Sequence, residues 1–198
     1  MAIIQNNCVQ PAVFLDRDGT VIEDRGHLRL PSDVCLFPDT CAALRALSSR
    51  FLFFIVTNQR GIADGILSLA DVERVNAHLC GLLAAAGICI RHVYVCPHRR
   101  EDACACIKPN PFFLHEAARE YQVDLSRSFM IGDHPHDVEC AAHAGARGIY
   151  VLTGHGQRHR DELPNGFQIA RSLSDASSLI LKEHNEQVEL AFPDGNGL

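Results

Sequence analysis

The chain has no tryptophan, and aromatic residues make up only 7% of its 198 residues. It also lacks any apolar run close to the roughly 18 residues that a membrane-spanning helix needs, so we expect no membrane partner. Lys and Arg number 18 against 24 Asp and Glu, and no extended basic segment occurs, which argues against nucleic acid as a partner. The N-terminal segment has neither a positively charged start nor a long apolar stretch, so no secretory signal is expected.

Cysteine, by contrast, is abundant. Nine cysteines, an odd number without a secretory signal, favour a reducing cytoplasmic location over disulfide formation. Six of them are scattered, and we expect them to behave as small apolar residues: Cys8, Cys35, Cys41, Cys80, Cys89 and Cys140. The apolar fraction of 47% and the charged fraction of 21% fit one soluble domain, which we place at residues 1–185, with 186–198 as a flexible C-terminal tail.

Short apolar segments alternate along the chain with segments of helical periodicity. The apolar segments predict buried strands at residues 12–16, 51–58, 91–95, 128–133 and 148–154. The periodic segments predict helices at residues 38–49, 68–87, 111–121 and 137–145, the second of which opens with a capping-box pattern. This alternation predicts an α/β fold, a Rossmann-like parallel sheet with helices on both faces.

Polar residues stand where the predicted strands end, at the edge of the sheet where ligands bind in such folds. They are Asp16, Asp18, Thr57, Asn58 and Asp133, with Asp137 one helical turn further on and Lys108 in the loop before a helix. Clustered carboxylates repel one another unless a cation lies among them, and oxygen ligands of this kind suit Mg²⁺. Mg²⁺ in turn suits a phosphorylated substrate.

Each of these residues fits a step of phosphoryl transfer. Asp16 is the candidate nucleophile, and Asp18 is placed to protonate the leaving oxygen and then to activate water. Lys108 and the Thr57 hydroxyl can hold the transferring group, while Asp133 completes the Mg²⁺ site. Any one of these aspartates, taken alone, could instead be only a helix cap.

Four short motifs occur in order along the chain. Residues 16–21 read DRDGTV, residues 56–59 VTNQ, residues 108–109 KP and residues 131–141 IGDHPHDVECA. The first resembles the DxDGT signature of the haloacid dehalogenase superfamily of phosphatases, and the other three are similar to its later motifs in the same order. The resemblance covers residues 12–155 and implies a Rossmann-like core, Mg²⁺ dependence and the roles given above. It also implies that Asp18 contributes its backbone carbonyl to Mg²⁺, beside the carboxylates of Asp16 and Asp133.

A second group of candidate ligands lies in residues 96–106. Cys96, His98, Cys104 and Cys106 offer three thiolates and an imidazole, a set that suits tetrahedral Zn²⁺ with no open position and hence a structural role. A disulfide is disfavoured by the cytoplasmic location, and a redox centre would more typically carry Cys-x-x-Cys. A cysteine-rich loop without metal remains the alternative.

The zinc loop resembles that of the heptose bisphosphate phosphatase and histidinol-phosphatase family. There the loop replaces a large cap domain and ends in the lysine motif, as Cys106 and Lys108 do here. Residues 23–28, 56–65 and 151–156 look more like the heptose enzymes, whereas the short zinc loop matches the usual spacing of the histidinol enzymes. The resemblance implies substrate contacts at Asp24, Arg25, Gly26, His27, Asn58, Gln59, Arg60 and His134.

The chain also departs from that family's pattern. Ile107 stands where an arginine usually meets the distal group of the substrate, and His134 stands where heptose enzymes often have lysine. Arg60, or Arg99 and Arg100 of the zinc loop, could supply a replacement cation for a second phosphate.

The sequence thus predicts a Mg²⁺-dependent phosphatase that forms an aspartyl-phosphate, with a structural Zn²⁺. The expected substrate is a small phosphorylated metabolite, D-glycero-D-manno-heptose 1,7-bisphosphate cleaved at its 7-phosphate. Histidinol phosphate is the enzymatic alternative, and a zinc-stabilised binding module with a decayed site is the non-enzymatic one. We expect a monomer or a weak homo-oligomer.

Overall fold

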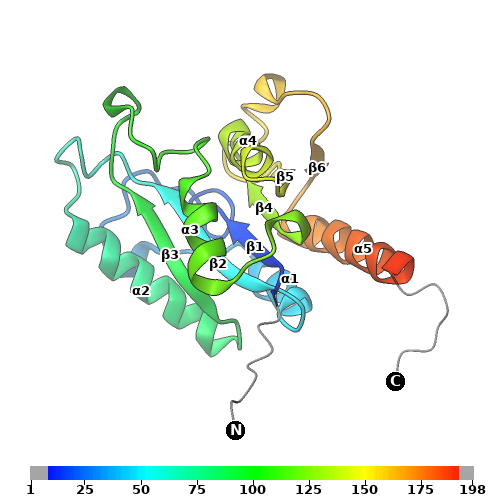
Figure 1. Cartoon of the computed structure of the whole chain (residues 1–198). Helices are drawn as coiled ribbons and strands as arrows, with labels where there is room; N and C mark the ends of the chain where they lie inside the picture. Colours follow the sequence, from blue (N-terminus) through cyan, green and yellow to red (C-terminus); the bar gives the residue numbers. More distant parts are fainter. Residues whose placement is uncertain (1–8, 192–198) are drawn as a thin grey trace, which may run out of the picture.

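A single parallel sheet of six strands organises the chain in the computed structural model, which describes residues 9–191, with side chains to residue 186 (Figure 1). The strand order is β3-β2-β1-β4-β5-β6. The strands are β1 (Ala12–Leu15), β2 (Leu52–Asn58), β3 (Ile90–Cys96), β4 (Phe129–Gly132), β5 (Arg147–Val151) and β6 (Gln168–Ala170). The α-helices are α1 (Thr40–Leu47), α2 (Leu69–Ala85), α3 (Phe112–Tyr121), α4 (Pro135–His143) and α5 (Leu173–Ala191), and short 3-10 turns include η1 (Pro31–Asp33), η2 (Arg100–Asp102), η3 (Leu125–Arg127) and η4 (Arg160–Glu162).

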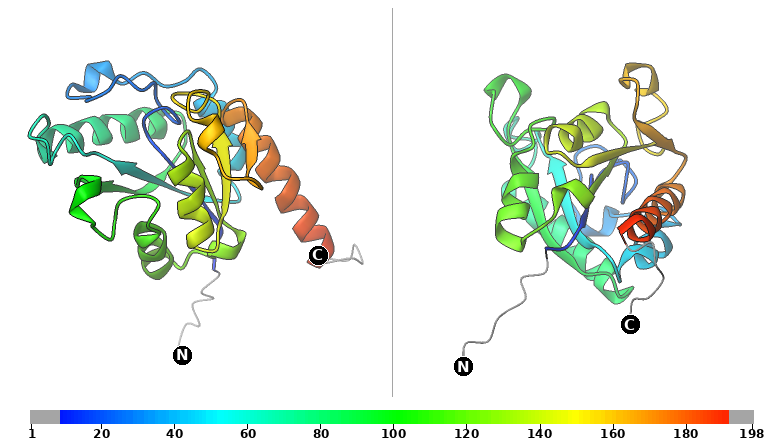
Figure 2. Two further views of the ribbon diagram at one scale, coloured as in Figure 1. Left: turned by 90° about the horizontal axis from the view of Figure 1, so that it is seen from above. Right: turned by 45° about the vertical axis from the view of Figure 1, so that its right-hand side comes forward.

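Helices cover both faces of the sheet (Figure 2) because alternate residues of each strand point to opposite sides. In β1, Val13 and Leu15 pack in the core that includes residues of α1, α2 and α5. Ala12 and Phe14 pack in the second core, with residues of α3 and α4. The predicted α/β architecture is therefore confirmed, and within residues 9–191 no inserted domain covers the carboxyl ends of the strands.

Two elements at the end of the chain were not predicted. Strand β6 has only three residues, too few for a recognisable alternation. Helix α5 runs to Ala191, so residues 186–191, which we placed in the C-terminal tail, are helical. The domain end at residue 185 stays a prediction. The apolar side chains of Ala176 and Ile180, four residues apart, are fully buried against the sheet and explain why this helix forms. The described part excludes residues 1–8 and 192–198. Cys8 and most of the N-terminal segment in which we expect no secretory signal therefore lie outside it.

Capping interactions fix the starts of two helices. The capping box predicted for α2 is present, with the Ser68 hydroxyl accepting from the Asp71 amide at 3.1 Å. An equivalent box opens α4, where Asp137 Oδ2 accepts from the His134 amide at 3.0 Å. Asp39 is the N-cap residue of α1, but its side chain makes no capping hydrogen bond. Its carboxylate accepts instead from the Ser174 amide at 2.8 Å and ties α1 to α5.

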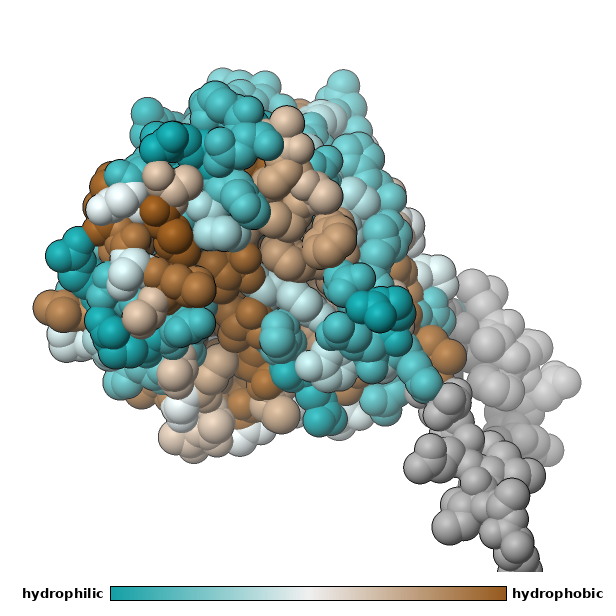
Figure 3. All heavy atoms as spheres, turned by 60° about the vertical axis from the view of Figure 1, so that its left-hand side comes forward, coloured by the Kyte–Doolittle hydropathy of each residue, from teal (hydrophilic) through white to brown (hydrophobic). Residues whose placement is uncertain are grey.

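Hydrophobic side chains gather between polar ones on the face that carries α2 and β3 (Figure 3). Leu69 and Leu82 of α2 and Phe112 at the start of α3 are among the large apolar residues that stay exposed. None of the helices in residues 9–191 combines the length and apolar character needed to cross a bilayer.

Helix α5 should contribute to stability like any core element. We expect Ile180→Ala to lower the free energy of unfolding by about 2–4 kcal/mol, because this fully buried side chain packs in the sheet core. The exposed Lys182, two residues further along the same helix, is a matched control. Lys182→Ala should change the free energy of unfolding by less than about 0.5 kcal/mol. Equal, small effects of both changes in urea unfolding would show that α5 is dispensable for the fold.

Candidate functional site

The candidate site lies at the switch point of the sheet. From β1 the chain runs outward through β2 and β3, then returns to place β4 on the other side of β1. Asp16 directly follows β1 and Asp133 directly follows β4, so both carboxylates flank the crevice where these folds bind ligands. Thr57 and Asn58, the last residues of β2, complete the rim.

Lys108 lies at the centre of this rim and is almost completely buried. Its ammonium group is 2.5 Å from Asp16 Oδ1 and 2.6 Å from Asp137 Oδ1, and it also donates to the carbonyl of Val56 at 3.0 Å. Burial opposes the charge, yet the two carboxylates outweigh it and raise the pKa of Lys108 above its ordinary value. The structure thus places a positive charge directly against the predicted nucleophile. Asp137 contacts Lys108 and also accepts a hydrogen bond from the His134 amide.

The carboxylates of Asp16, Asp133 and Asp137 converge so that each offers an oxygen within 4.8 Å of the others. Burial raises the pKa of Asp16 to about 6 despite Lys108. Burial, together with the charges of Asp16 and Asp137, raises the pKa of Asp133 to about 8. Three acids this close are fully ionised together only beside a cation, so the donor set fits an oxygen-preferring divalent ion.

Two glycines make room for the Asp133 carboxylate. A Cβ added at Gly19 or at Gly154 would overlap the Asp133 side chain, and both glycines have positive φ. Asp133 Oδ2 also accepts from the His155 amide at 2.7 Å. The orientation of the Asp133 carboxylate is therefore constrained by the backbone at Gly19, Gly154 and His155.

Asp18 is positioned differently from the other acids, because its side chain lies outside the carboxylate group. Its Oδ2 accepts from Arg17 and from Gln59, whereas its Oδ1 is buried without a hydrogen-bond partner. Burial raises the pKa of Asp18, although the Arg17 charge opposes this. Asp18 lines the same pocket as Asp16 and Lys108, at a position suited to an acid or base.

The predicted substrate contacts divide into two groups. Asp24, Asn58 and His134 line the pocket with the predicted catalytic residues. Arg25, Gly26, His27, Gln59 and Arg60 do not line it. Arg25 pairs with Glu23 on the surface, and Gln59 is buried beneath the rim, where it donates to Thr57 Oγ1 at 2.9 Å.

The structure separates the three arginines considered as replacement cations. Arg60 and Arg99 both pair with Asp64, at 3.1 and 2.6 Å. Arg100 lines the pocket and donates to Nδ1 of His136, which also lines it, at 3.2 Å. His136 was not predicted; the only signal for it was its position two residues after His134, inside the capping turn of α4.

The rings of His134 and His136 stack at 4.3 Å between centroids. Burial lowers the pKa of His134 to about 4, and burial together with His134 lowers the pKa of His136 to about 4. Both imidazoles are therefore neutral near pH 7, and Arg100 carries the positive charge on this side of the pocket.

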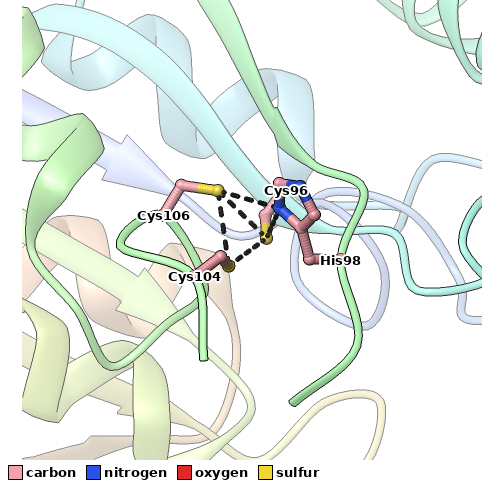
Figure 4. A group of neighbouring side chains, drawn as sticks. All are labelled: Cys96, His98, Cys104 and Cys106. Carbon is pink, nitrogen blue, oxygen red and sulfur yellow. Dashed lines mark hydrogen bonds between the residues drawn. The ribbon is translucent and has the colours of Figure 1, made fainter. Parts of the chain in front are cut away.

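The three cysteines and His98 of the loop after β3 converge (Figure 4). Cys106 Sγ is 3.3 Å from Cys96 Sγ and 3.6 Å from Cys104 Sγ, and 3.4 Å from Nδ1 of His98. A tetrahedral ion with Zn–S bonds of about 2.3 Å holds its sulfurs about 3.8 Å apart, so the cluster needs little adjustment to bind one. All four predicted ligands are brought together, and the cysteines of residues 9–191 are all free.

This cluster is linked directly to the pocket. Lys108 follows Cys106 by two residues, and its amide donates to Asn58 Oδ1 at 3.3 Å. Asn110 donates to the carbonyl of Cys104 at 2.9 Å, which closes the loop on itself. The cluster therefore fixes the segment from which Lys108 enters the site.

Comparison with known proteins agrees with this geometry. A family model described as HAD-hydrolase-like matches residues 105–176. The D-glycero-beta-D-manno-heptose-1,7-bisphosphate 7-phosphatase of Bordetella bronchiseptica is 31% identical over 175 residues, covering 86% of this chain and 98% of the relative. The D-glycero-D-manno-heptose-1,7-bisphosphate 7-phosphatase of Thermosynechococcus vestitus is 37% identical over 161 residues, covering 75% of this chain and 82% of the relative.

Solved structures give the same result. The crystal structure of the D,D-heptose 1,7-bisphosphate phosphatase from B. bronchiseptica, complexed with magnesium and phosphate, aligns with a TM-score of 0.81 at 30% identity, covering 88% of this chain and 99% of that one. A putative HAD-like phosphatase from Mesorhizobium loti aligns with a TM-score of 0.72 at 29% identity, covering 87% and 85%. The chain therefore belongs to the family of the D-glycero-D-manno-heptose-1,7-bisphosphate 7-phosphatases, within the haloacid dehalogenase-like hydrolases.

Proposed function

We propose that this chain is a Mg²⁺-dependent phosphatase that removes the 7-phosphate of D-glycero-D-manno-heptose 1,7-bisphosphate. The observation that carries the proposal is the contact between the Lys108 ammonium and Asp16 Oδ1, in one pocket with Asp18 and Asp133. This arrangement supplies a nucleophile, a positive charge, an acid and a metal ligand for phosphoryl transfer. The names of the relatives supply the substrate.

In the first step, a carboxylate oxygen of Asp16 attacks the phosphorus in line with the ester bond. A P–O bond to Asp16 forms while the P–O bond to the sugar breaks. Asp18 gives its proton to the departing sugar oxygen, so the alcohol leaves neutral and Asp18 becomes a carboxylate. The Lys108 ammonium and the Thr57 hydroxyl stabilise the negative charge of the transferring group.

In the second step, the Asp18 carboxylate takes a proton from a water molecule as the water oxygen attacks the phosphorus. The bond to Asp16 breaks, inorganic phosphate leaves, and Asp18 is protonated again for the next cycle. One residue thus serves as acid and then as base.

Asp16, Asp133 and the backbone carbonyl of Asp18 would hold the Mg²⁺. When bound, this ion supplies charge neutralisation for the phosphoryl oxygens and removes the repulsion between the two carboxylates. Asp137 belongs to the same acidic group but is already engaged with Lys108 and the His134 amide. We therefore assign it to positioning rather than to the metal.

The cluster of Cys96, His98, Cys104 and Cys106 would hold a structural Zn²⁺. Its four ligands leave no position for substrate, and its contribution is to keep Lys108 in place. This loop would stand in for a cap domain, and the lack of an inserted domain within residues 9–191 supports that role.

The second phosphate of the substrate would lie against Arg100, which lines the pocket where Arg60 and Arg99 do not. Arg100 would replace the family arginine lost at Ile107. Neutral His134 and His136 beside it can donate or accept hydrogen bonds without adding charge.

This cation also discriminates between candidate substrates. Histidinol phosphate carries an amine at its distal end, which Arg100 would repel, and the relatives compared above are heptose enzymes. The decayed binding module is disfavoured because Asp16, Asp18, Lys108 and Asp133 share one pocket. We further propose a cytoplasmic protein that is a monomer or a weak homo-oligomer, with a small phosphorylated metabolite and neither nucleic acid nor membrane as its partner.

Replacement of the nucleophile tests the reaction. Asp16→Asn should lower phosphate release from the heptose bisphosphate by at least about 10³-fold, since an amide cannot form the phosphoryl intermediate. The exposed Asp161→Asn should keep the parental rate, and circular dichroism should be the same for both variants. An Asp16→Asn enzyme with parental turnover would remove Asp16 from the mechanism.

Removal of one thiolate tests the structural metal. Cys104→Ser should reduce bound zinc well below one equivalent per chain, as measured by plasma mass spectrometry, and lower activity through disorder of the segment around Lys108. Cys89→Ser, at an exposed cysteine outside the cluster, should retain both. A full equivalent of zinc in the Cys104→Ser protein would exclude Cys104 as a ligand.

Substitution of Arg100, with its neighbour Arg99 as the control, tests where the second phosphate of the substrate binds. Arg100→Ala should raise KM for the heptose bisphosphate by about 10-fold or more, because a hydrogen bond to a charged group is worth about 1.5–3 kcal/mol. In the same Arg100→Ala variant, KM for an aryl phosphate, which has no second phosphate, should stay within about 2-fold of the parental value. Arg99→Ala should leave both values unchanged. Equal effects of the two substitutions on the bisphosphate would contradict the assignment of Arg100.

A further inference from the structure

Arg17 is fully buried and is the largest such side chain in the described part of the protein. The catalytic steps proposed above give it no role, although it stands between the nucleophile Asp16 and the acid Asp18 in the chain. A buried guanidinium is costly unless its N–H groups are paired. Its partners therefore indicate what it is for.

The guanidinium of Arg17 bridges two elements. Its Nε and Nη2 both donate to Asp18 Oδ2, at 3.0 and 2.7 Å, so two N–H groups of the guanidinium share one carboxylate oxygen. Its Nη1 donates to Asn76 Oδ1 at 2.7 Å. Asn76 is a buried amide on the side of α2 whose other core residues, Val75 and Leu79 among them, are apolar.

All the hydrogen bonds to the Asp18 carboxylate go to the same oxygen. Gln59 Nε2 adds a third donor to Oδ2 at 2.8 Å. Oδ1 is buried and has no partner, although Asp18 lines the pocket. An oxygen that accepts three N–H donors is a poor place for a proton, so Oδ1 is the atom left to carry one and to exchange it with substrate.

We propose that Arg17, anchored by Asn76, is a positioning residue that reserves Oδ1 of Asp18 for proton transfer. The inference rests on the proposed function, because it concerns the acid of that reaction. It assigns to helix α2, which contributes no residue to the pocket lining, a part in the protonation of the leaving group. A purely structural ion pair would instead stabilise the fold without acting on one chemical step.

The two roles differ in their dependence on the leaving group. Loss of a well-placed acid slows the release of a sugar alkoxide, which needs a proton, but not the release of 2,4-dinitrophenolate, which leaves without one. The value kcat/KM reports the steps up to the departure of the leaving group, so later hydrolysis of the phosphoryl enzyme does not obscure it. The comparison therefore requires kcat/KM for the heptose bisphosphate and for 2,4-dinitrophenyl phosphate, both with Mg²⁺.

The first variant is Arg17→Met, which keeps the bulk of the side chain but removes all its N–H donors. The second is Asn76→Ala, which keeps the two hydrogen bonds from Arg17 to Asp18 but removes the acceptor for Nη1. We expect kcat/KM for the heptose bisphosphate to fall by about 10²-fold in Arg17→Met and by about 10-fold in Asn76→Ala. For the dinitrophenyl ester, kcat/KM should change by less than about 3-fold in both variants. Asn76→Asp, which retains an acceptor for Nη1, should restore kcat/KM for the sugar substrate to within about 3-fold of the parent. Asn76→Ala keeps the test available if Arg17→Met does not fold.

Equal losses with both substrates, or no loss with either, would overturn the positioning role of Arg17. An unmodified enzyme that hydrolyses neither ester would contradict the proposed function itself, and the acid role with it. An unmodified enzyme that cleaves both esters, with variants whose selectivity does not change, would leave the proposed function intact and exclude only this inference.

Discussion

The site depends on the repulsion between carboxylates that the topology of the sheet brings together. Asp16 follows β1 and Asp133 follows β4, and these neighbouring strands meet at the point where the order of the sheet reverses. Asp137 joins them from the first turn of α4. Three acids buried at one edge are unstable as anions unless positive charge is near, and Lys108 supplies part of it through its contacts with Asp16 and Asp137. The three carboxylates could also hold a divalent cation, which in the proposed function supplies the remaining positive charge for a phosphate.

The position of Lys108 is in turn an outcome of the loop after β3. This loop has no regular structure beyond one short 3-10 turn, so its conformation must come from side chains. The four-ligand cluster and the hydrogen bonds of Asn58 and Asn110 supply that constraint. One loop therefore joins the cluster of three cysteines and His98, a candidate metal site, to Lys108, and it also carries Arg100 to the same pocket.

Much of this arrangement could be predicted from the sequence, because strand ends and ligand spacing are local properties. Asp16, Thr57 and Asp133 follow apolar segments, and the rule that parallel strands end at one edge places them together. What could not be predicted depends on contacts between distant segments. Arg17 meets Asn76 across 59 positions of sequence, and the choice of Arg100 over Arg99 depends on where Asp64 lies. Helix α5 was not predicted because most of its residues are polar, and the few apolar side chains that it buries do not give a clear helical pattern in the sequence.

In the proposed function, this pocket releases the 7-phosphate of a heptose bisphosphate. The most direct test is to follow phosphate release with Mg²⁺ from D-glycero-D-manno-heptose 1,7-bisphosphate and from histidinol phosphate side by side, and to identify the remaining sugar phosphate by ³¹P NMR. The proposed function predicts faster cleavage of the bisphosphate, and the names of the relatives predict that the 1-phosphate is retained. Preferential cleavage of histidinol phosphate, or loss of the 1-phosphate in place of the 7-phosphate, would contradict this account.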